Sequence, residues 1–341
     1  MDKRIFGRYM FAVLVCTVML FAVTGTAVSR PVVIKLGTPT PEGSPWNDIL
    51  QGLASEWKEI SGGRVQMKIF PGGIAGDELD MIRKMRINTI QGAVISGVGL
   101  NGISPLSMIL SLPFFIRSEA EFDYVFERVK KDLENDIGKA GFTMVGWTRA
   151  GWMYFFSRDP VVHPRDLRDQ KIAAADTDMV MAPALKAMGF HTVSLTLNEI
   201  MSGLVSGMID ACYTVPMGAV AYQWFGIANH MCDLPIAPAL GGIIISNRTW
   251  RSIPENIRGR LKQATARTVE KLHKLNTDIE KEVMNIMLEN GLKKMEVPEE
   301  AVSEWRKLFE QGFRSLAGKA FPLETYEYVE EYLTAYRSRY P

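Results

Sequence analysis

The sequence predicts an α/β fold with two lobes. Short apolar runs alternate along the chain with longer stretches in which apolar residues recur at helical spacing, and this alternation is typical of α/β architecture. A chain of 341 residues is long enough to bury two sizeable cores. Its composition is ordinary for a globular protein, without a low-complexity tract or an obvious repeat. We therefore expect two α/β lobes that exchange chain more than once.

The first lobe is expected to begin with a strand at Val32–Gly37, a run rich in β-branched residues. An amphipathic helix then follows Pro45 and ends at Gly62-Gly63. A second strand, a helix and a buried strand are expected over residues 65–70, 77–85 and 93–95. Asp77 and Glu78 lie in the first turn of that helix, where carboxylates interact favourably with the helix dipole.

The second half of the chain continues the alternation. Strands are expected over residues 153–157, 192–195, 208–213 and 241–245, and helices over 176–188 and 198–206. Glu199 falls in the first turn of the last of these helices. From Pro254 to Gly291 apolar residues recur at helical spacing, which predicts one or two long helices. We assign residues 31–150 and 238–285 to lobe I, and residues 151–237 and 286–341 to lobe II.

Residues 1–27 have the features of a signal peptide. Lys3, Arg4 and Arg8 form a positive start, Met10–Val23 is apolar, and small residues follow it. The apolar run is short for a membrane-spanning helix, so we expect cleavage and export to the periplasm, with a retained anchor as the alternative. Lipid attachment at Cys16 is not expected, because a small residue is normally wanted where Val15 stands.

Charge and composition exclude several classes of function. Lys+Arg of 39 against Asp+Glu of 38 gives no basic field for nucleic acid. The four histidines show no metal-ligand spacing with one another or with a cysteine, so no metal or other cofactor is expected. Cys212 and Cys232 read as small buried hydrophobes, with a disulfide as the alternative. No nucleophile–base arrangement or phosphate loop is present, so catalysis is not indicated.

Several short motifs follow one another in a specific order. In the first half they are Gly43-Ser44-Pro45, Gly62-Gly63-Arg64-Val65, Phe70-Pro71-Gly72-Gly73 and Leu112-Pro113-Phe114-Phe115. In the second half they are Gly151-Trp152-Met153, His163-Pro164-Arg165-Asp166-Leu167, Gln170-Lys171-Ile172-Ala173 and Ser206-Gly207-Met208-Ile209-Asp210. With this series the chain resembles the solute-binding (P) subunits of TRAP transporters, the tripartite ATP-independent periplasmic carriers, over nearly all of its length after the leader.

The resemblance implies a periplasmic-binding-protein-like fold with a hinge, in which one strand and one long helix span both lobes and ligand binds in the cleft between them. In typical members an arginine after the Lys-Ile pair clamps the carboxylate of an organic acid. That position is Ala173 here, and a second common arginine position is Met153. The chain is therefore expected to belong to a divergent branch that lacks the clamp. Arg149 is the candidate substitute, although a structural role for it is equally expected.

The lining that replaces the clamp is expected to be apolar, with roughly half of the aromatic candidates serving only the core. The candidate ligand-binding residues are Trp46, Ser96, Phe115, Arg149, Trp152, Met153, Ala173, Tyr213, Met217 and Trp224.

The first hypothesis for function is a receptor for a small hydrophobic or amphipathic molecule, which it delivers to a TRAP integral-membrane permease. The resemblance makes an accessory periplasmic helical-repeat protein a possible further partner. The alternatives are an organic-acid receptor anchored by Arg149 or by backbone amides, and a non-transport ligand sensor.

Overall fold

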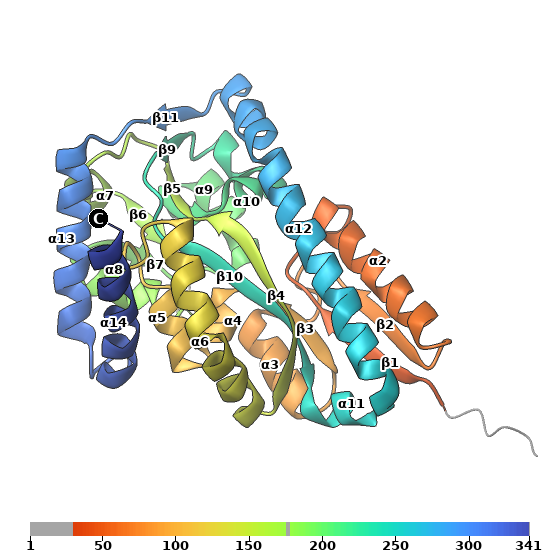
Figure 1. Ribbon diagram of the computed structural model, residues 1–341. Helices are drawn as coiled ribbons and strands as arrows, with labels where there is room; N and C mark the ends of the chain where they lie inside the picture. Colours follow the sequence, from red (N-terminus) through yellow and green to blue (C-terminus); the bar gives the residue numbers. More distant parts are fainter. Residues whose placement is uncertain (1–29, 175–177, 341) are drawn as a thin grey trace, which may run out of the picture. The chain divides into compact units, whose positions relative to one another are not determined.

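The computed structural model describes residues 30–174 and 178–340 (Figure 1). The expected signal peptide lies outside these residues, as does the start of the helix expected from residue 176. Within the described ranges, none of the helices combines the length and the apolar composition needed to cross a membrane.

The first lobe is built on a five-stranded sheet in the order β2-β1-β3-β10-β4. β1 pairs in parallel with β2 and β3, whereas β10 is antiparallel to both β3 and β4. The strands are β1 (Val32–Gly37), β2 (Val65–Phe70), β3 (Gly92–Ile95), β4 (Phe142–Trp152) and β10 (Pro238–Ser246). The strands expected over residues 32–37, 65–70 and 93–95 are thus confirmed.

The helices of this lobe begin at residues suited to capping. Ser44 accepts a hydrogen bond from the Asn47 amide at the start of α2, and Asp77 does the same for α3. The helices are α2 (Pro45–Ile60), α3 (Glu78–Arg86), α4 (Gly97–Asn101), α5 (Pro105–Leu110), α6 (Glu119–Lys139) and α11 (Asn247–Ser252).

The second lobe is built on a six-stranded sheet in the order β11-β9-β5-β8-β6-β7. Its strands are β5 (Tyr154–Ser157), β6 (Lys171–Ala173), β7 (His191–Val193), β8 (Ala211–Thr214), β9 (His230–Cys232) and β11 (Lys293–Met295). The α-helices between them are α7 (Pro164–Arg168), α8 (Met181–Ala187), α9 (Ile200–Ser206) and α10 (Pro216–Ala221), and two 3₁₀ turns cover Leu197–Glu199 and Trp224–Gly226.

Both cysteines of this lobe are free and buried. Cys212 in β8 and Cys232 in β9 lie on strands that flank β5. Burial raises the pKa of each thiol to about 12, so both stay protonated at neutral pH. They serve as small core side chains.

One strand and one helix connect the lobes, as expected. β4 leads into β5 through Met153, and α12 (Glu255–Glu289) packs against β4 and α2 of the first lobe and α10 of the second. Gly146 allows the close approach of this helix, because a Cβ at Gly146 would lie 2.6 Å from Cγ2 of Thr265.

The C-terminal helices change the expected lobe boundary. α13 (Glu299–Leu316) packs against α7 and α8 of the second lobe, but α14 (Leu323–Arg339) packs against α5 and α6 of the first. Residues 286–341 therefore do not all belong with lobe II. The guanidinium of Arg337 explains the attachment of α14, since it donates to both carboxylate oxygens of Glu121 on α6, at 2.7 and 2.9 Å.

Replacing Arg337 tests this attachment. The Glu121 side chain is 8% exposed and that of Arg337 is 32% exposed, so Arg337→Gln leaves a largely buried carboxylate without its charged partner, with the Arg117 amide still donating to it. We expect a loss of about 2 kcal/mol in the free energy of unfolding. This is less than the cost of breaking a fully buried ion pair, because Arg337 is partly exposed to solvent. Urea denaturation measures it. Arg314→Gln is the matched control, because that 60%-exposed arginine pairs with Glu310 and Glu330 at the surface. An equal loss in both variants would contradict the prediction.

Candidate functional site

The strand that joins the lobes has an unusual backbone at the junction. Gly151 has a φ of +95°, a conformation that costs a residue with a Cβ more than it costs glycine. Two residues later, the N–H of Met153 donates to the C=O of Ala237, and its C=O accepts from Ile236. The chain thus turns sharply at Gly151 while it remains hydrogen-bonded to the segment that precedes β10.

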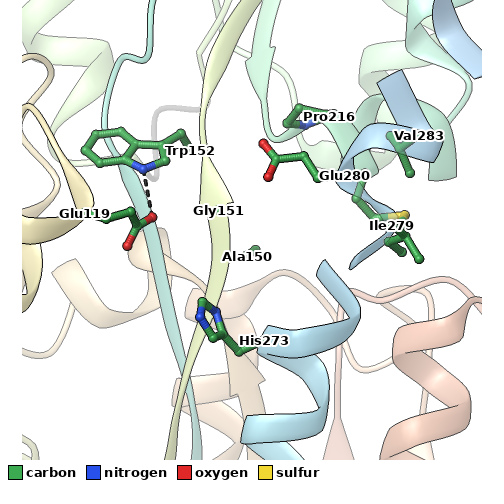
Figure 2. A pocket seen from close by; sticks show the side chains of 10 residues that line it. Glu119, Ala150, Gly151, Trp152, Pro216, His273, Ile279, Glu280 and Val283 are labelled. Atoms are coloured by element: carbon green, nitrogen blue, oxygen red, sulfur yellow. Dashed lines mark hydrogen bonds between the residues drawn. The ribbon is translucent and has the colours of Figure 1, made fainter. Parts of the chain in front are cut away.

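A small cavity lies at this junction, with walls from both lobes (Figure 2). Its volume is about 70 Å³, roughly the share of two liquid water molecules. Two expected residues, Trp152 and Met217, line it. The other lining residues are Glu119, Ala150, Gly151, Pro216, His273, Ile279, Glu280 and Val283. The cavity is too small for a sugar acid in this arrangement of the lobes.

The lobes also meet through their loops. The hydroxyl of Tyr222, after α10, donates to the C=O of Pro39 in the first lobe at 2.9 Å. The ring of Tyr222 stacks on Trp224, with the ring centroids 5.0 Å apart. Trp224 is only 1% exposed, so it supports Tyr222 from the core and has no open surface for a ligand. Burial raises the pKa of Tyr222 far above its usual value, which keeps the hydroxyl a donor.

A carboxylate of the chain occupies the backbone amides at the start of α4. Oε2 of Glu78 accepts from the amide and the hydroxyl of Ser96, both at 3.0 Å, and from the amide of Gly99 at 2.7 Å. Desolvation raises the pKa of Glu78, against the lowering effect of these hydrogen bonds. Ser96, expected to contact ligand, donates its hydroxyl and amide hydrogens to Glu78, and its contact with ligand stays a prediction. The sequence placed Glu78 in the first turn of a helix but did not predict that it binds the start of α4.

Arg149 is held by the first lobe. Its guanidinium pairs with Asp123 at 2.6 Å and with Glu119 at 3.0 Å, and it lies over the ring of Phe122. The indole N–H of Trp152 donates to the other oxygen of Glu119, at 2.8 Å. All these partners belong to α6. The side chains of residues 149 and 152 therefore fix the end of β4 to this helix, and a role for Arg149 in ligand binding stays a prediction.

The two expected clamp positions carry no charge. Ala173 ends β6 and is 3% exposed, packed in the core cluster that contains Phe156 and Cys212. Met153 is half-buried and packs against a different core cluster, the one that contains Phe155. Neither position offers a guanidinium to an acid, and Ala173 offers no open surface in this arrangement.

Of the remaining candidates, Tyr213 is the best defined. Its hydroxyl donates to Oδ2 of Asp178 at 2.6 Å, while Oδ1 of Asp178 accepts from the amides of Val180 and Met181 at the start of α8. Desolvation and the Asp178 charge raise the pKa of Tyr213 well above its usual value. Phe115 stacks on Tyr326 of α14, with the centroids 5.0 Å apart, and Trp46 is half-buried in the first turn of α2.

The described part of the chain holds no group of three or more His, Cys, Asp or Glu side chains that could bind a metal ion. The geometry is that of two lobes which meet around a small cavity, with backbone donors already satisfied by the chain's own carboxylates.

The family model of the bacterial extracellular solute-binding proteins, family 7, matches residues 36–319. This match spans more than half of the chain. The chain belongs to this family of TRAP solute-binding proteins.

Relatives of this family-7 protein include the 2,3-diketo-L-gulonate-binding periplasmic protein YiaO of Escherichia coli. The two are 29% identical over 168 residues, which cover 49% of each chain. A solute-binding protein of Roseobacter denitrificans is 22% identical over 253 residues, covering 72% of this chain and 76% of the relative.

Solved structures share the fold of this family-7 protein. The TRAP periplasmic solute-binding protein of Xanthobacter autotrophicus Py2, with bound β-D-galacturonate, matches with a TM-score of 0.79 and 17% identity, over 88% of this chain and 99% of that one. That of Roseobacter denitrificans OCh 114, with bound L-galactonate, matches with a TM-score of 0.80 and 18% identity, over 89% and 99%. These matches confirm the two-lobed α/β fold.

Tyr213→Phe tests the hydrogen bond between the Tyr213 hydroxyl and the Asp178 carboxylate. Removing the hydroxyl takes one hydrogen bond from the buried Asp178 carboxylate, and we expect a loss of about 1–2 kcal/mol in the free energy of unfolding. Chemical denaturation measures this loss. Tyr154→Phe is the control, because the Tyr154 hydroxyl has no hydrogen-bond partner among the described residues. If both variants lose the same stability, the Tyr213–Asp178 bond is not the cause.

Proposed function

We propose that this family-7 protein is an extracytoplasmic receptor of a TRAP-type transporter that captures a small apolar or amphipathic molecule between its lobes. It passes the molecule to the integral-membrane permease subunits, with the helical-repeat protein named above as a further candidate partner. It acts by lobe closure and carries out no covalent chemistry. The signal peptide, cleaved on export, places it in the periplasm.

The chemistry of the two clamp positions carries the proposal for the ligand. Burying a ligand carboxylate without a partner costs several kcal/mol of binding free energy. A bidentate guanidinium is the group best suited to pair with it. Ala173 and Met153 supply a methyl group and a thioether instead. Arg149, on the strand β4 that ends just before Met153, has its charge balanced by Glu119 and Asp123. A ligand held by apolar contact suits these residues better than an acid does.

An organic acid is the second candidate, because the solved neighbours hold galacturonate and galactonate and YiaO is named for diketogulonate. An acid would need an anchor in this chain. The Ser96 and Gly99 amides already bind Glu78, and Arg149 would have to leave two carboxylates. Displacing Glu78 from these amides, or Arg149 from its carboxylates, would cost part of the binding free energy.

The decisive test is to identify what the protein carries. Native mass spectrometry of protein purified from its own host, followed by solvent extraction, should give an apolar or amphipathic molecule. A bound sugar acid would overturn the proposed ligand class and leave the receptor function intact. Calorimetric titration with galacturonate, galactonate and glucuronate then gives the affinity for acids directly, and we expect none tighter than the millimolar range.

Ala173→Arg tests whether the clamp position alone decides specificity. The new guanidinium would enter the buried core cluster that contains Phe156 and Cys212, so we expect lower stability and no gain of carboxylate binding in the same titrations. Ala173→Leu serves as the control for side-chain size. Tight binding of a sugar acid by the arginine variant would refute the view that the surrounding apolar wall also excludes acids.

A further inference from the structure

A second concave surface lies on the first lobe, away from the junction. It is a depression of about 560 Å³ bounded by the end of α3, the start of β4 and α11. Three arginines line it: Arg86 from α3, and Arg248 and Arg251 from α11. Figure 1 shows α3 and α11 at the same end of the first sheet. The depression belongs to neither the cavity nor the loops that join the lobes.

The three arginines are not neutralised locally. All three are exposed, and no carboxylate lines the depression. Their guanidinium groups form no ion pair or hydrogen bond with any residue in the described ranges. Nearby carboxylates are otherwise engaged: Asp80 pairs with Arg83, and Asp136 accepts from Ser104 and lies 3.9 Å from Lys139. Glu255, four residues after Arg251, forms no ion pair with it within the described contacts.

An apolar side chain stands at the edge of the same depression. Ile87 lines it and is 75% exposed, the most exposed of the large hydrophobic side chains described. It precedes Asn88, whose φ of +61° turns the chain at the end of α3. An isoleucine held out of the core beside three arginines is the combination that binds a lipid surface, since the arginines meet phosphates and the apolar side chain enters the interface.

We propose that this arginine depression docks the protein on an anionic phospholipid membrane. The wide and open shape of the depression suits several headgroup phosphates better than one enclosed small molecule. Guanidinium groups bind phosphate oxygens in bidentate geometry. Docking would keep the receptor at the membrane that holds its permease, so the inference adds a location to the proposed function without depending on the identity of the ligand.

Vesicle flotation tests the proposal with the mature chain. Vesicles of phosphatidylethanolamine and phosphatidylglycerol should bind the protein, and vesicles of phosphatidylcholine alone should not. The triple variant Arg86→Gln, Arg248→Gln, Arg251→Gln should partition about 100-fold more weakly, since each arginine near an anionic surface contributes about a factor of five. Added salt should weaken wild-type binding.

A control variant separates local from overall charge. Lys271→Gln, Lys281→Gln and Lys307→Gln remove the same charge from exposed sites elsewhere and should bind vesicles like the wild type. Equal binding by both triple variants would overturn the proposal, as would equal binding to phosphatidylcholine. Saturable stabilisation by inorganic pyrophosphate without vesicle binding would overturn it in favour of a soluble phosphate ligand. Thermal unfolding of each variant verifies that it folds. Vesicle binding should be the same whether or not the protein carries a ligand between its lobes.

Discussion

The arrangement of the two lobes depends on one antiparallel pair of strands. β10 pairs with β4 from Ser246 opposite Phe142 to Pro238 opposite Trp152, and the hydrogen bonds of Met153 to Ala237 and Ile236 extend the pairing to the point where β5 begins. The crossings from β4 to β5 and from β9 to β10 therefore follow the same hydrogen-bonded ladder, and α12 forms a third crossing between the sheets. A relative motion of the lobes has to be absorbed where this ladder is irregular, near the register shift between Pro238 and Leu240 and the turn at Gly151.

The side chains around these paired strands further restrict where the chain can bend between the lobes. Arg149 and Trp152 are both bound to Glu119 on α6, so β4 moves with the first lobe up to Trp152. Beyond that residue the chain enters β5 and the second sheet. We therefore expect bending to concentrate after Trp152, slightly beyond the boundary at residue 150 that the sequence suggests. The small cavity lies beside this point, which makes its volume sensitive to the angle between the lobes.

Sequence patterns predicted the elements that depend on local chemistry. The strands at Val32–Gly37 and Val65–Phe70 follow from β-branched and alternating apolar runs. Asp77 and Glu199, expected in the first turns of helices, lie at helix starts. At Glu199, hydrogen bonds from the amide and hydroxyl of Thr196 lower the pKa of the carboxyl. The motif series likewise predicted a family that the match over residues 36–319 confirms.

What the sequence could not predict were pairings between distant residues. Arg149 meets Glu119 and Asp123, which lie 30 and 26 positions earlier, and Glu78 reaches Ser96 and Gly99 across a strand. Packing of α14 against the first lobe depends on Arg337 and Glu121, separated by 216 positions. Periodicity shows which face of a helix is apolar, but it does not identify the partner of an exposed charge.

These pairings also bear on the proposed ligand class. The chain's own carboxylates occupy donors on both lobes, since Glu78 binds the amides that start α4 and Asp178 binds those that start α8. Under the proposed function, these amides do not serve as anchors for a ligand carboxylate. The proposed apolar ligand needs no such anchor and would gain affinity from apolar burial, at about 25 cal/mol per Å². Burying about 400 Å² would contribute roughly 10 kcal/mol before the cost of association. The cavity of about 70 Å³ is too small for a ligand of that size, so the proposed function includes separation of the Tyr222–Pro39 contact and opening of the lobes on binding.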